Sequence, residues 1–373
     1  MIELPSMDEF GLAWLEGSGP YADVVLSTRV RLARNLQGHA FSPRVRDDER
    51  LAILNNVQRA ADHSALLRDG VSVDIAALSR LSRQVLLERH LVSRELVGEG
   101  GPGPYAGAGL IVGPDEQAGV MVNEEDHLRL QSLMSGLRLR EAYGVVDGLD
   151  EELGAQLAMA FHHEFGYLTS CPTNVGTGLR ASILVHLPGL VLTKEIGKVL
   201  QGIGQVGLTF RGLYGEGSEV VGNFFQISNQ TTLGKAEEDL IDHLHKIVQQ
   251  VIQYEMQART VLMQEAPAVI EDKIWRAYGL LRYARSLTFE EVMNLLSGVR
   301  LGVSMKLLSG PSVYTLNKIM IYTQAAHLEE ATGRPLSDAE SDLQRAEYVR
   351  RTLTEAGEGP SEADGNGSGS EVE

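Results

Sequence analysis

The chain has 373 residues, a formal net charge of -17 at pH 7 and an apolar fraction of 43%. This length allows one large domain or two moderate ones with a real core. The acidic charge argues against general nucleic-acid binding, because phosphates attract a basic surface. No apolar stretch approaches the ~20 residues that a membrane-spanning helix needs. The sequence therefore predicts neither a nucleic-acid nor a membrane partner.

The number of cysteines and the N-terminal sequence indicate the cellular compartment. The single cysteine, Cys171, cannot form an internal disulfide, and no Cys/His cluster has zinc-finger spacing. The N-terminus lacks the basic region followed by an apolar run that marks a signal peptide. We therefore expect a reducing, cytoplasmic location.

The first part of the chain, from about residue 20 to residue 232, mixes strand-like and helical segments. Apolar residues alternate as in strands in "GLIV", "GVMVN", "HLRLQSLM", "LRASILVHLP" and "VGLTFRGLYG". "LDEELGAQLAMAFHHEF" instead has helical spacing, with Asp150 placed to cap the helix. These patterns predict an α+β domain.

The second part is almost entirely helical. Apolar residues recur three and four apart in "LIDHLHKIVQQVIQYEMQ" and "TFEEVMNLLSGVRLGV". The end of the chain is rich in Gly, Ser and Glu without apolar periodicity, so we expect it to be disordered. We predict an α+β domain over residues 1–232, whose closing helix could extend to about residue 260, a helical domain over 233–355 and an acidic tail over 356–373.

Arginine is the residue type that points to chemistry in the first domain. Arg29 and Arg31 are two apart, so on a strand both side chains would leave the same face. Guanidinium groups are costly to cluster unless an anion lies among them. A polyphosphate fits best, because it accepts forked hydrogen bonds, whereas each arginine alone could equally be a solvated surface charge. The other candidates are Arg129 in "NEEDHLRL", Arg180 in "GTGLRAS" and Arg211 in "RGLYGEGSE".

Two other kinds of site are disfavoured. The chain has no Walker loop and no G-x-G-x-x-G motif that follows a strand and opens a helix. His162 and His163 are adjacent on a predicted helix, so they point in different directions, and no third ligand is evident. We therefore predict no resident metal site.

Four ordered segments, "STRVRLARN", "NEEDHLRL", "CPTNVGTGLRAS" and "RGLYGEGSE", resemble the signature segments of the phosphagen (guanidino) kinase family. The resemblance covers about residues 21–250 and implies the family's antiparallel sheet flanked by helices. Creatine and arginine kinases have a helical domain before the first segment, whereas here that segment begins at Ser27 and the helical extension is C-terminal. This order is similar to that of the bacterial protein-arginine kinases, and the more open site would suit a polypeptide.

The resemblance also implies the nucleotide site. The five arginines would bind the phosphates of ATP, with Mg²⁺ held mainly by phosphates and water. His90, which otherwise looks like a surface helix histidine, would join them. The implied ATP-binding residues are Ser27, Thr28, Arg29, Val30, Arg31, His90, Arg129, Arg180, Ala181, Ser182, Ile183, Leu184, Arg211, Gly212, Leu213, Tyr214, Gly215 and Glu216.

The acceptor site follows from the same resemblance. A guanidinium is a poor nucleophile while protonated, so two carboxylates, Glu125 and Glu216, would align it and favour proton loss. Cys171 would border the guanidinium as a thiolate, the alternative being a small buried packing residue. For Glu124 and Asp126 we expect loop capping and solvated charge.

The helical domain would contain a phosphoarginine pocket, which the related bacterial enzymes mark with Arg-Asp-x-x-Arg-Ala. Here "SDLQRA" has Ser341 in place of the first arginine, while Asp342, Arg345 and Ala346 match. Loss of one cation would weaken phosphate binding and allosteric control by phosphoarginine. The alternative for this stretch is an exposed helix face.

Three functions remain open at this point. The first is a protein-arginine kinase that marks proteins for a Clp-type protease in stress response, with an McsA-like activator and a homodimer implied by the family. The second is a kinase for free arginine or another small guanidino compound. The third is a non-catalytic phosphoarginine-binding adaptor, which would have no need of the guanidinium-aligning carboxylates.

Overall fold

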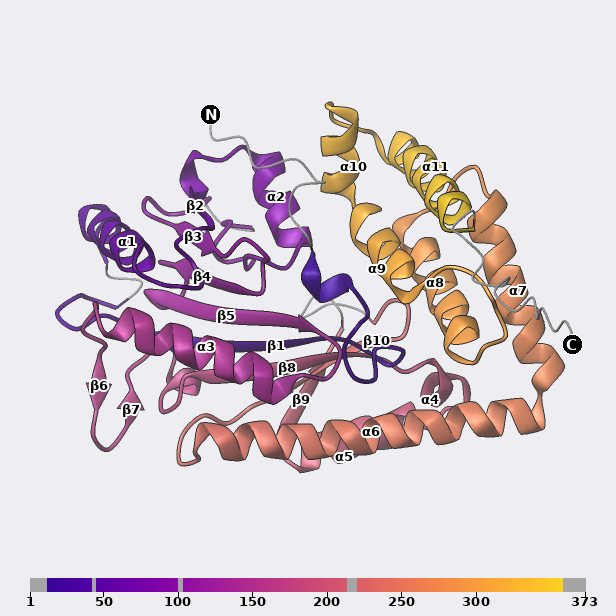
Figure 1. The fold of residues 1–373 in the computed structure, drawn as a ribbon, viewed down its shortest axis with the longest axis horizontal. Helices are drawn as coiled ribbons and strands as arrows, with labels where there is room; N and C mark the ends of the chain where they lie inside the picture. Colours follow the sequence, from indigo (N-terminus) through magenta and orange to yellow (C-terminus); the bar gives the residue numbers. More distant parts are fainter. Residues whose placement is uncertain (1–11, 42–44, 100–102, 213–219, 358–373) are drawn as a thin grey trace, which may run out of the picture.

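A computed structural model describes residues 12–41, 45–99, 103–212 and 220–357. Its centre is an eight-stranded antiparallel sheet with strand order β2-β3-β4-β5-β1-β8-β10-β9 (Figure 1). The strands are β1 (Val25–Arg34), β2 (Val71–Asp74), β3 (Gly109–Val112), β4 (Ala118–Val122), β5 (Leu128–Ser135), β8 (Leu179–His186), β9 (Leu208–Arg211) and β10 (Phe224–Asn229). The predicted strand segments are confirmed, except that residues 213–215 of "VGLTFRGLYG" lie outside the described residues.

One face of the sheet packs against helices. Buried side chains of β1, β5, β8 and β10 share a hydrophobic core with α1 (Asp47–Ala61), α3 (Leu139–Gly154) and α6 (Glu237–Glu265). Burial of this continuous apolar surface is the main stabilising contribution to the fold. In Figure 1, α3 and α6 lie along one side of the sheet. Two shorter helices, α4 (Pro188–Leu192) and α5 (Ile196–Gln205), lie on the connection from β8 to β9.

The C-terminal helices form a second core. It contains residues of α7 (Pro267–Tyr283), α8 (Phe289–Ser304), α9 (Val313–Tyr322) and α11 (Asp338–Gly357), and it takes in the N-terminal 3-10 turn η1 (Ala13–Leu15). Leu133, Leu184 and Phe224 of the sheet also belong to this core. The C-terminal helices therefore cover one end of the sheet face that α3 and α6 leave open. The predicted helical character of this region is confirmed.

A third, smaller core lies at the β2 edge of the sheet. There α2 (Arg80–Glu88) packs with β2, β3 and β4, and a short turn η2 (Ile75–Ala77) precedes it. The helix α10 (Ala325–Thr332) contacts α2 from the C-terminal side. Through this contact a segment of the first domain and a segment of the C-terminal helices meet beside the open sheet face.

The helix predicted over "LDEELGAQLAMAFHHEF" is confirmed only as far as Gly154, and Asp150 does not cap it. Asp150 lies inside α3, where its carboxylate accepts a hydrogen bond of 2.7 Å from Nη2 of the buried Arg34. The following residues form a hairpin of β6 (Phe161–His162) and β7 (Gly166–Tyr167). The reason is tertiary: Met159 bridges to Leu36 after β1, and this pairing overrides the helical spacing.

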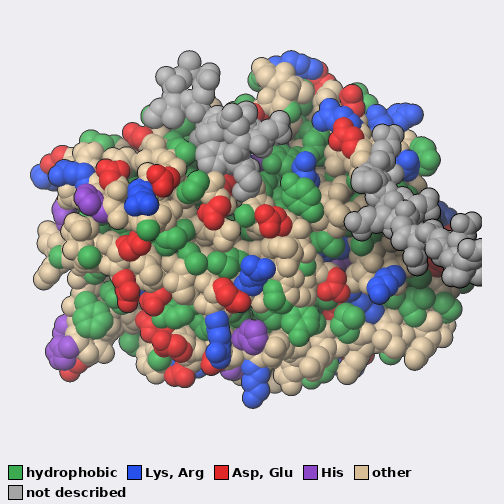
Figure 2. All heavy atoms as spheres, in the orientation of Figure 1, with side chains coloured by type: hydrophobic (Ala, Val, Ile, Leu, Met, Phe, Trp, Pro, Cys, Tyr) green, Lys and Arg blue, Asp and Glu red, His purple; other side chains and the backbone are tan. Residues whose placement is uncertain are grey.

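The surface of the molecule reflects its acidic composition. Figure 2 shows acidic side chains spread widely over one face and interspersed with basic ones. Among the described helices, none is both long and apolar enough to cross a bilayer. The predicted acidic tail, 356–373, lies outside the described residues from 358 onward.

Candidate active site

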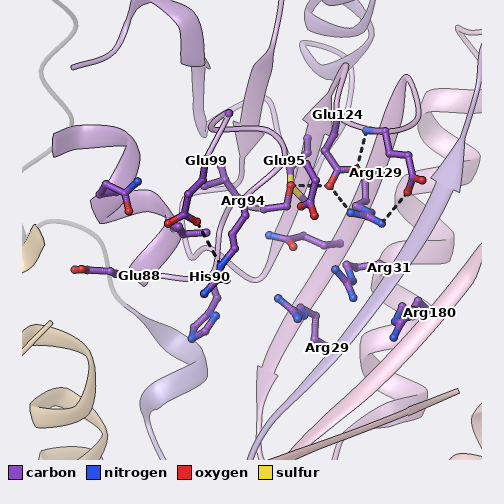
Figure 3. Close-up of a pocket in the computed structure, with 18 of the residues that line it drawn as sticks. Arg29, Arg31, Glu88, His90, Arg94, Glu95, Glu99, Glu124, Arg129 and Arg180 are labelled. Atoms are coloured by element: carbon purple, nitrogen blue, oxygen red, sulfur yellow. Dashed lines mark hydrogen bonds and ion pairs between the residues drawn. The ribbon is translucent and has the colours of Figure 1, made fainter. Parts of the chain in front are cut away.

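A cavity of about 1160 Å³ lies on the sheet face opposite α3 and α6. Alternation along the strands explains its lining, because side chains two apart leave the same face of a sheet. Figure 3 shows Arg29 and Arg31 of β1 and Arg180 of β8 projecting into the same space. All five arginines predicted to bind phosphate line this one cavity: Arg29, Arg31, Arg129, Arg180 and Arg211.

The arginines at the centre of the cavity lie close enough to repel one another. Burial, with repulsion from Arg129 and Arg180, lowers the pKa of Arg29 to about 10. Burial and three neighbouring arginines lower the pKa of Arg31 well below its ordinary value, although Glu124 opposes this shift. The buried Nε of Arg31 has no hydrogen-bond acceptor among the described residues. An anion with several oxygens would relieve this concentration of charge.

Arg129, near the start of β5, interacts with two carboxylates from the preceding loop. Its Nη1 pairs with Oε1 of Glu124, and its Nη2 lies 3.9 Å from Oε2 of Glu125. Glu124 also accepts a hydrogen bond of 2.6 Å from the Ser93 hydroxyl. Although burial opposes ionisation, Arg129 and Ser93 keep the pKa of Glu124 below its ordinary value. Glu124 thus fixes the guanidinium of Arg129 in the cavity wall.

The expectation of solvated charge at Glu124 and Asp126 is wrong. The side chain of Glu124 is 1% exposed. Asp126 is also buried, and its Oδ1 accepts hydrogen bonds of 2.6 Å from Asn35 Nδ2 and from the Ser170 backbone N–H. The expected bracing of loops is confirmed for Asp126, which ties the segment before Cys171 to the end of β1.

Glu125 and Cys171 lie together at one side of the cavity. Glu125 is 41% exposed, and Cys171 is half-buried with its Sγ 3.0 Å from the Thr173 hydroxyl. Burial raises the pKa of Glu125, with Asp126 and Glu124 adding to the shift, while Arg129 and a hydrogen bond from Cys171 oppose it. A carboxylate of raised pKa is a better proton acceptor. Because Cys171 lines the cavity, the alternative of a buried packing residue does not fit.

The structure does not place every predicted side chain in the main cavity. Ser27, Ser182 and Leu184 line a small adjoining cavity together with Arg29 and His90. The intervening strand residues point into the helix-covered core: Thr28, Val30, Ala181 and Ile183. Gly212 follows β9, whereas Leu213, Tyr214, Gly215 and Glu216 lie outside the described residues.

His90 lies in the cavity wall and not on a surface helix. It follows α2, has a backbone φ of 62° and lines both cavities. Burial, with the positive charge of Arg29, lowers its pKa to about 3, so the imidazole is neutral. Its place beside Arg29 agrees with the site that the resemblance implies.

The predicted phosphoarginine motif lies on α11, with Ser341, Arg345 and Ala346 buried, so an exposed helix face is excluded for them. Arg345 donates to the Thr323 and Leu287 carbonyls at 2.8 and 2.9 Å and to Asp342 at 2.5 Å. It also lines the main cavity. Most of its described hydrogen bonds therefore brace the C-terminal helices.

Sequence reasoning missed the wall that faces the arginines. It consists of residues of α2, of the segment after it and of the C-terminal region: Gln84, Glu88, Ser93, Glu95, Glu99, Phe289, Gln324 and Ala325. Gln131 of β5 also lines the cavity. Figure 3 shows Glu88, Glu95 and Glu99 on this side. No local motif marks these residues, because tertiary packing brings them together. Among the described residues, no group of three or more His, Cys, Asp or Glu side chains could hold a metal ion.

Two family models match the chain in succession. The C-terminal catalytic domain of ATP:guanido phosphotransferases matches residues 52–258, and the C-terminal domain of the protein-arginine kinase McsB matches residues 267–364. A protein-arginine kinase of Moorella thermoacetica is 43% identical over 343 residues, covering 91% of this chain and 97% of that relative. One of Bacillus cereus (strain G9842) is 43% identical over 350 residues, covering 93% and 97%.

Solved structures show the same fold. The substrate-free duplicated taurocyamine kinase from Schistosoma mansoni matches 69% of this chain and 38% of that chain, with a TM-score of 0.56 and 26% identity. A lombricine kinase matches 66% and 71%, with a TM-score of 0.56 and 23% identity, a likeness of fold alone. The chain therefore belongs to the ATP:guanido phosphotransferase family and is an enzyme of that class. Within the family, its curated relatives are protein-arginine kinases, so the resemblance seen in the four motifs is confirmed.

Proposed function

We propose that this protein transfers the γ-phosphoryl group of ATP to arginine side chains of proteins. The observation that carries the proposal is the cavity in which five arginines meet Glu125 and Cys171. The McsB-type C-terminal domain and the names of the curated relatives support a protein as the acceptor. An adaptor without catalysis would have no need of Glu125 beside the arginine cluster.

Phosphoryl transfer requires neutralisation of charge on the transferred group and in-line placement of the acceptor. Arg29, Arg31 and Arg180 would bind the phosphate oxygens, with Arg129 fixed for the same task by Glu124. Because these groups are already desolvated and oriented, little reorganisation is needed when charge develops. Mg²⁺ would arrive with the nucleotide and supply further charge neutralisation.

The acceptor arginine would enter beside Glu125 and Cys171. Glu125 would align one guanidinium nitrogen and accept its proton as the phosphorus–nitrogen bond forms. A thiolate at Cys171 would stabilise the positive charge of the incoming guanidinium. Glu216, the second carboxylate implied by the family, lies outside the described residues, so its role remains a prediction.

The partners and the cellular location are inferred from the family resemblance and not from the geometry of the site. We propose a cytoplasmic homodimer that works with an McsA-like activator and delivers substrates to a Clp-type protease. We also propose that the catalytic domain ends with α6, whose residues as far as Ala258 pack in the first core. The site around Asp342, Arg345 and Ala346 would bind phosphoarginine weakly, because Ser341 replaces a cation and Arg345 is engaged in internal hydrogen bonds.

An acceptor assay tests the proposed function. With labelled ATP and Mg²⁺, the protein should place acid-labile label on casein-like protein, since a P–N bond is broken in acid. Free L-arginine should accept much less. Label in free arginine but not in protein would favour the kinase for small guanidino compounds, and transfer to neither would favour the adaptor.

Activity should be lost at a higher pH than it would be if the catalytic base had the ordinary pKa of a glutamate. Glu125 acts as a base only when ionised, and its pKa is raised above 4.5. The active fraction therefore falls as pH decreases through this raised pKa. We expect kcat/KM for a protein acceptor, measured from about pH 9 down to about pH 4, to decline on the acid side. A profile that stays flat over this range would contradict the assignment of Glu125 as the base.

A further inference from the structure

An aromatic side chain that no motif marks lies against the proposed nucleotide site. Trp14 of η1 is 1% exposed. Its ring meets the His90 imidazole edge to face, with centroids 5.6 Å apart and planes at 76°. Trp14 and His90 line the small cavity that shares Arg29, His90 and Gln226 with the main one. Trp14 therefore touches a residue of the site although it precedes the matched catalytic segment, which begins at residue 52.

His90 has a conformation that depends on its surroundings. Its φ of 62° is in the left-handed region, which non-glycine residues rarely adopt and which persists where neighbouring structure determines it. Two residues earlier, the Glu88 carboxylate accepts hydrogen bonds from the Ala326 and His327 backbone N–H groups at 2.9 and 3.0 Å. The end of α2 is thus attached to the first turn of α10, and Trp14 packs on the imidazole itself.

The C-terminal helices also hold Trp14. The Leu15 carbonyl accepts a hydrogen bond of 2.7 Å from Asn317 Nδ2 of α9. Leu12, Trp14 and Leu15 belong to the same core as the buried residues of α8 and α9. On the other side, the Gly17 backbone N–H donates to the Ser135 hydroxyl at the end of β5, at 3.0 Å. The indole is therefore fixed between the helical domain and the sheet.

We propose that Trp14 is a positioning residue for the nucleotide: it holds the His90 imidazole at the cavity wall in the orientation that binds ATP. The C-terminal helices set this orientation through η1 and through the Glu88 contact with α10. The inference rests on the proposed function, because it takes His90 as a nucleotide contact. The buried indole Nε1, which has no acceptor among the described residues, is an additional donor at this site.

Two substitutions separate the ring from its N–H group. Trp14→Leu removes the aromatic edge, and we expect the MgADP Kd and the KM for ATP to rise about three- to tenfold, the value of one edge-to-face pair. The KM for the protein acceptor should not change. Trp14→Phe should restore most of the nucleotide affinity if the edge matters, and little of it if the N–H matters. Unchanged nucleotide affinity in both folded variants would overturn the proposal, because a merely structural role would lower only Tm and the active fraction.

Tryptophan fluorescence gives a test that leaves Trp14 in place. The chain has two tryptophans, and the other, Trp275, is half exposed on α7. In Trp275→Phe, MgADP should change the emission of Trp14 saturably, with the Kd found by calorimetry, and His90→Ala should reduce this change. Nucleotide binding by calorimetry without any change in emission would overturn the inference alone. Failure of the wild-type protein to bind MgADP would instead overturn the proposed function.

Discussion

Glu125→Ala is expected to abolish phosphoryl transfer while MgATP binds within about threefold of the wild-type affinity. Loss of a positioned base costs roughly 10²–10⁴-fold in rate, and loss of guanidinium alignment adds to that cost. ATP affinity should survive because Arg129 keeps its buried partner Glu124, whereas its contact with Glu125 is 3.9 Å long and partly exposed. Single-turnover transfer to a protein acceptor and calorimetric titration with MgATP measure the two effects separately.

The neighbouring carboxylate provides the matched control. Glu124→Gln removes the buried charge that holds Arg129, so this variant should lose nucleotide affinity as well as rate. Glu125→Gln keeps the shape of the side chain and should match Glu125→Ala in rate, since an amide cannot accept the proton. If Glu125→Ala instead lost MgATP binding, Glu125 would belong to the nucleotide site and the proposed division of roles would be wrong.

Periodicity along β1 predicted a common face for Arg29 and Arg31, whereas their convergence with the other arginines was predicted only through the family resemblance. The two-residue spacing of Arg29 and Arg31 requires a common face, and antiparallel pairing sets Arg180 opposite Arg31. The pairing itself could not be read from spacing, because register depends on turns and on distant strands. The four motifs, through the family resemblance, indicated which segments of the chain meet at the site.

The wall opposite the arginines could not be predicted, and the reason is physical. Glu88 is the last residue of an ordinary amphipathic helix, α2, and its hydrogen bonds to α10 are tertiary contacts that no local motif marks. His90, two residues later, entered the predicted site only through the family resemblance, and its packing on Trp14 of η1 is likewise non-local. The buried state of Glu124 likewise depends on Ser93, 31 residues earlier in the chain. Acidic loop residues are usually solvated, so local composition favoured the wrong environment for this carboxylate.

The helical domain is attached to the catalytic domain by buried polar groups as well as by apolar packing. Arg300 of α8 donates to Asn317 of α9 and to the Ala22 carbonyl, each at 2.7 Å. Arg259 of α6 donates to Ser304 of α8 at 2.6 Å. Hydrogen bonds from buried guanidinium groups resist displacement of one domain against the other, because a displaced donor would remain buried and unsatisfied. This interface can therefore hold Trp14 and α10 in a defined position beside the nucleotide site.

Arg31→Met is expected to abolish MgATP binding without destabilising the nucleotide-free protein. Partial burial, with repulsion from three neighbouring arginines, lowers the pKa of Arg31 although Glu124 opposes the shift, so the ionised form disfavours the folded state at neutral pH. Methionine keeps most of the apolar stem. We expect Tm of the nucleotide-free variant to equal that of the wild type or to exceed it by about 2–4 °C, which corresponds to roughly 1 kcal/mol.

The nucleotide-dependent shift in Tm makes the loss of binding visible in the same experiment. MgATP at a hundred times its Kd stabilises the wild-type protein by about 2.7 kcal/mol, and this shift should be absent in Arg31→Met. Arg68→Met, at a side chain that is 59% exposed outside the cavity, should leave both the basal Tm and the shift unchanged. A variant that lost stability but kept the MgATP shift would show that Arg31 supports the fold and not the nucleotide. If the Arg31→Met variant loses MgATP binding but is as stable as the wild type or more stable, Arg31 serves nucleotide binding at a cost in stability.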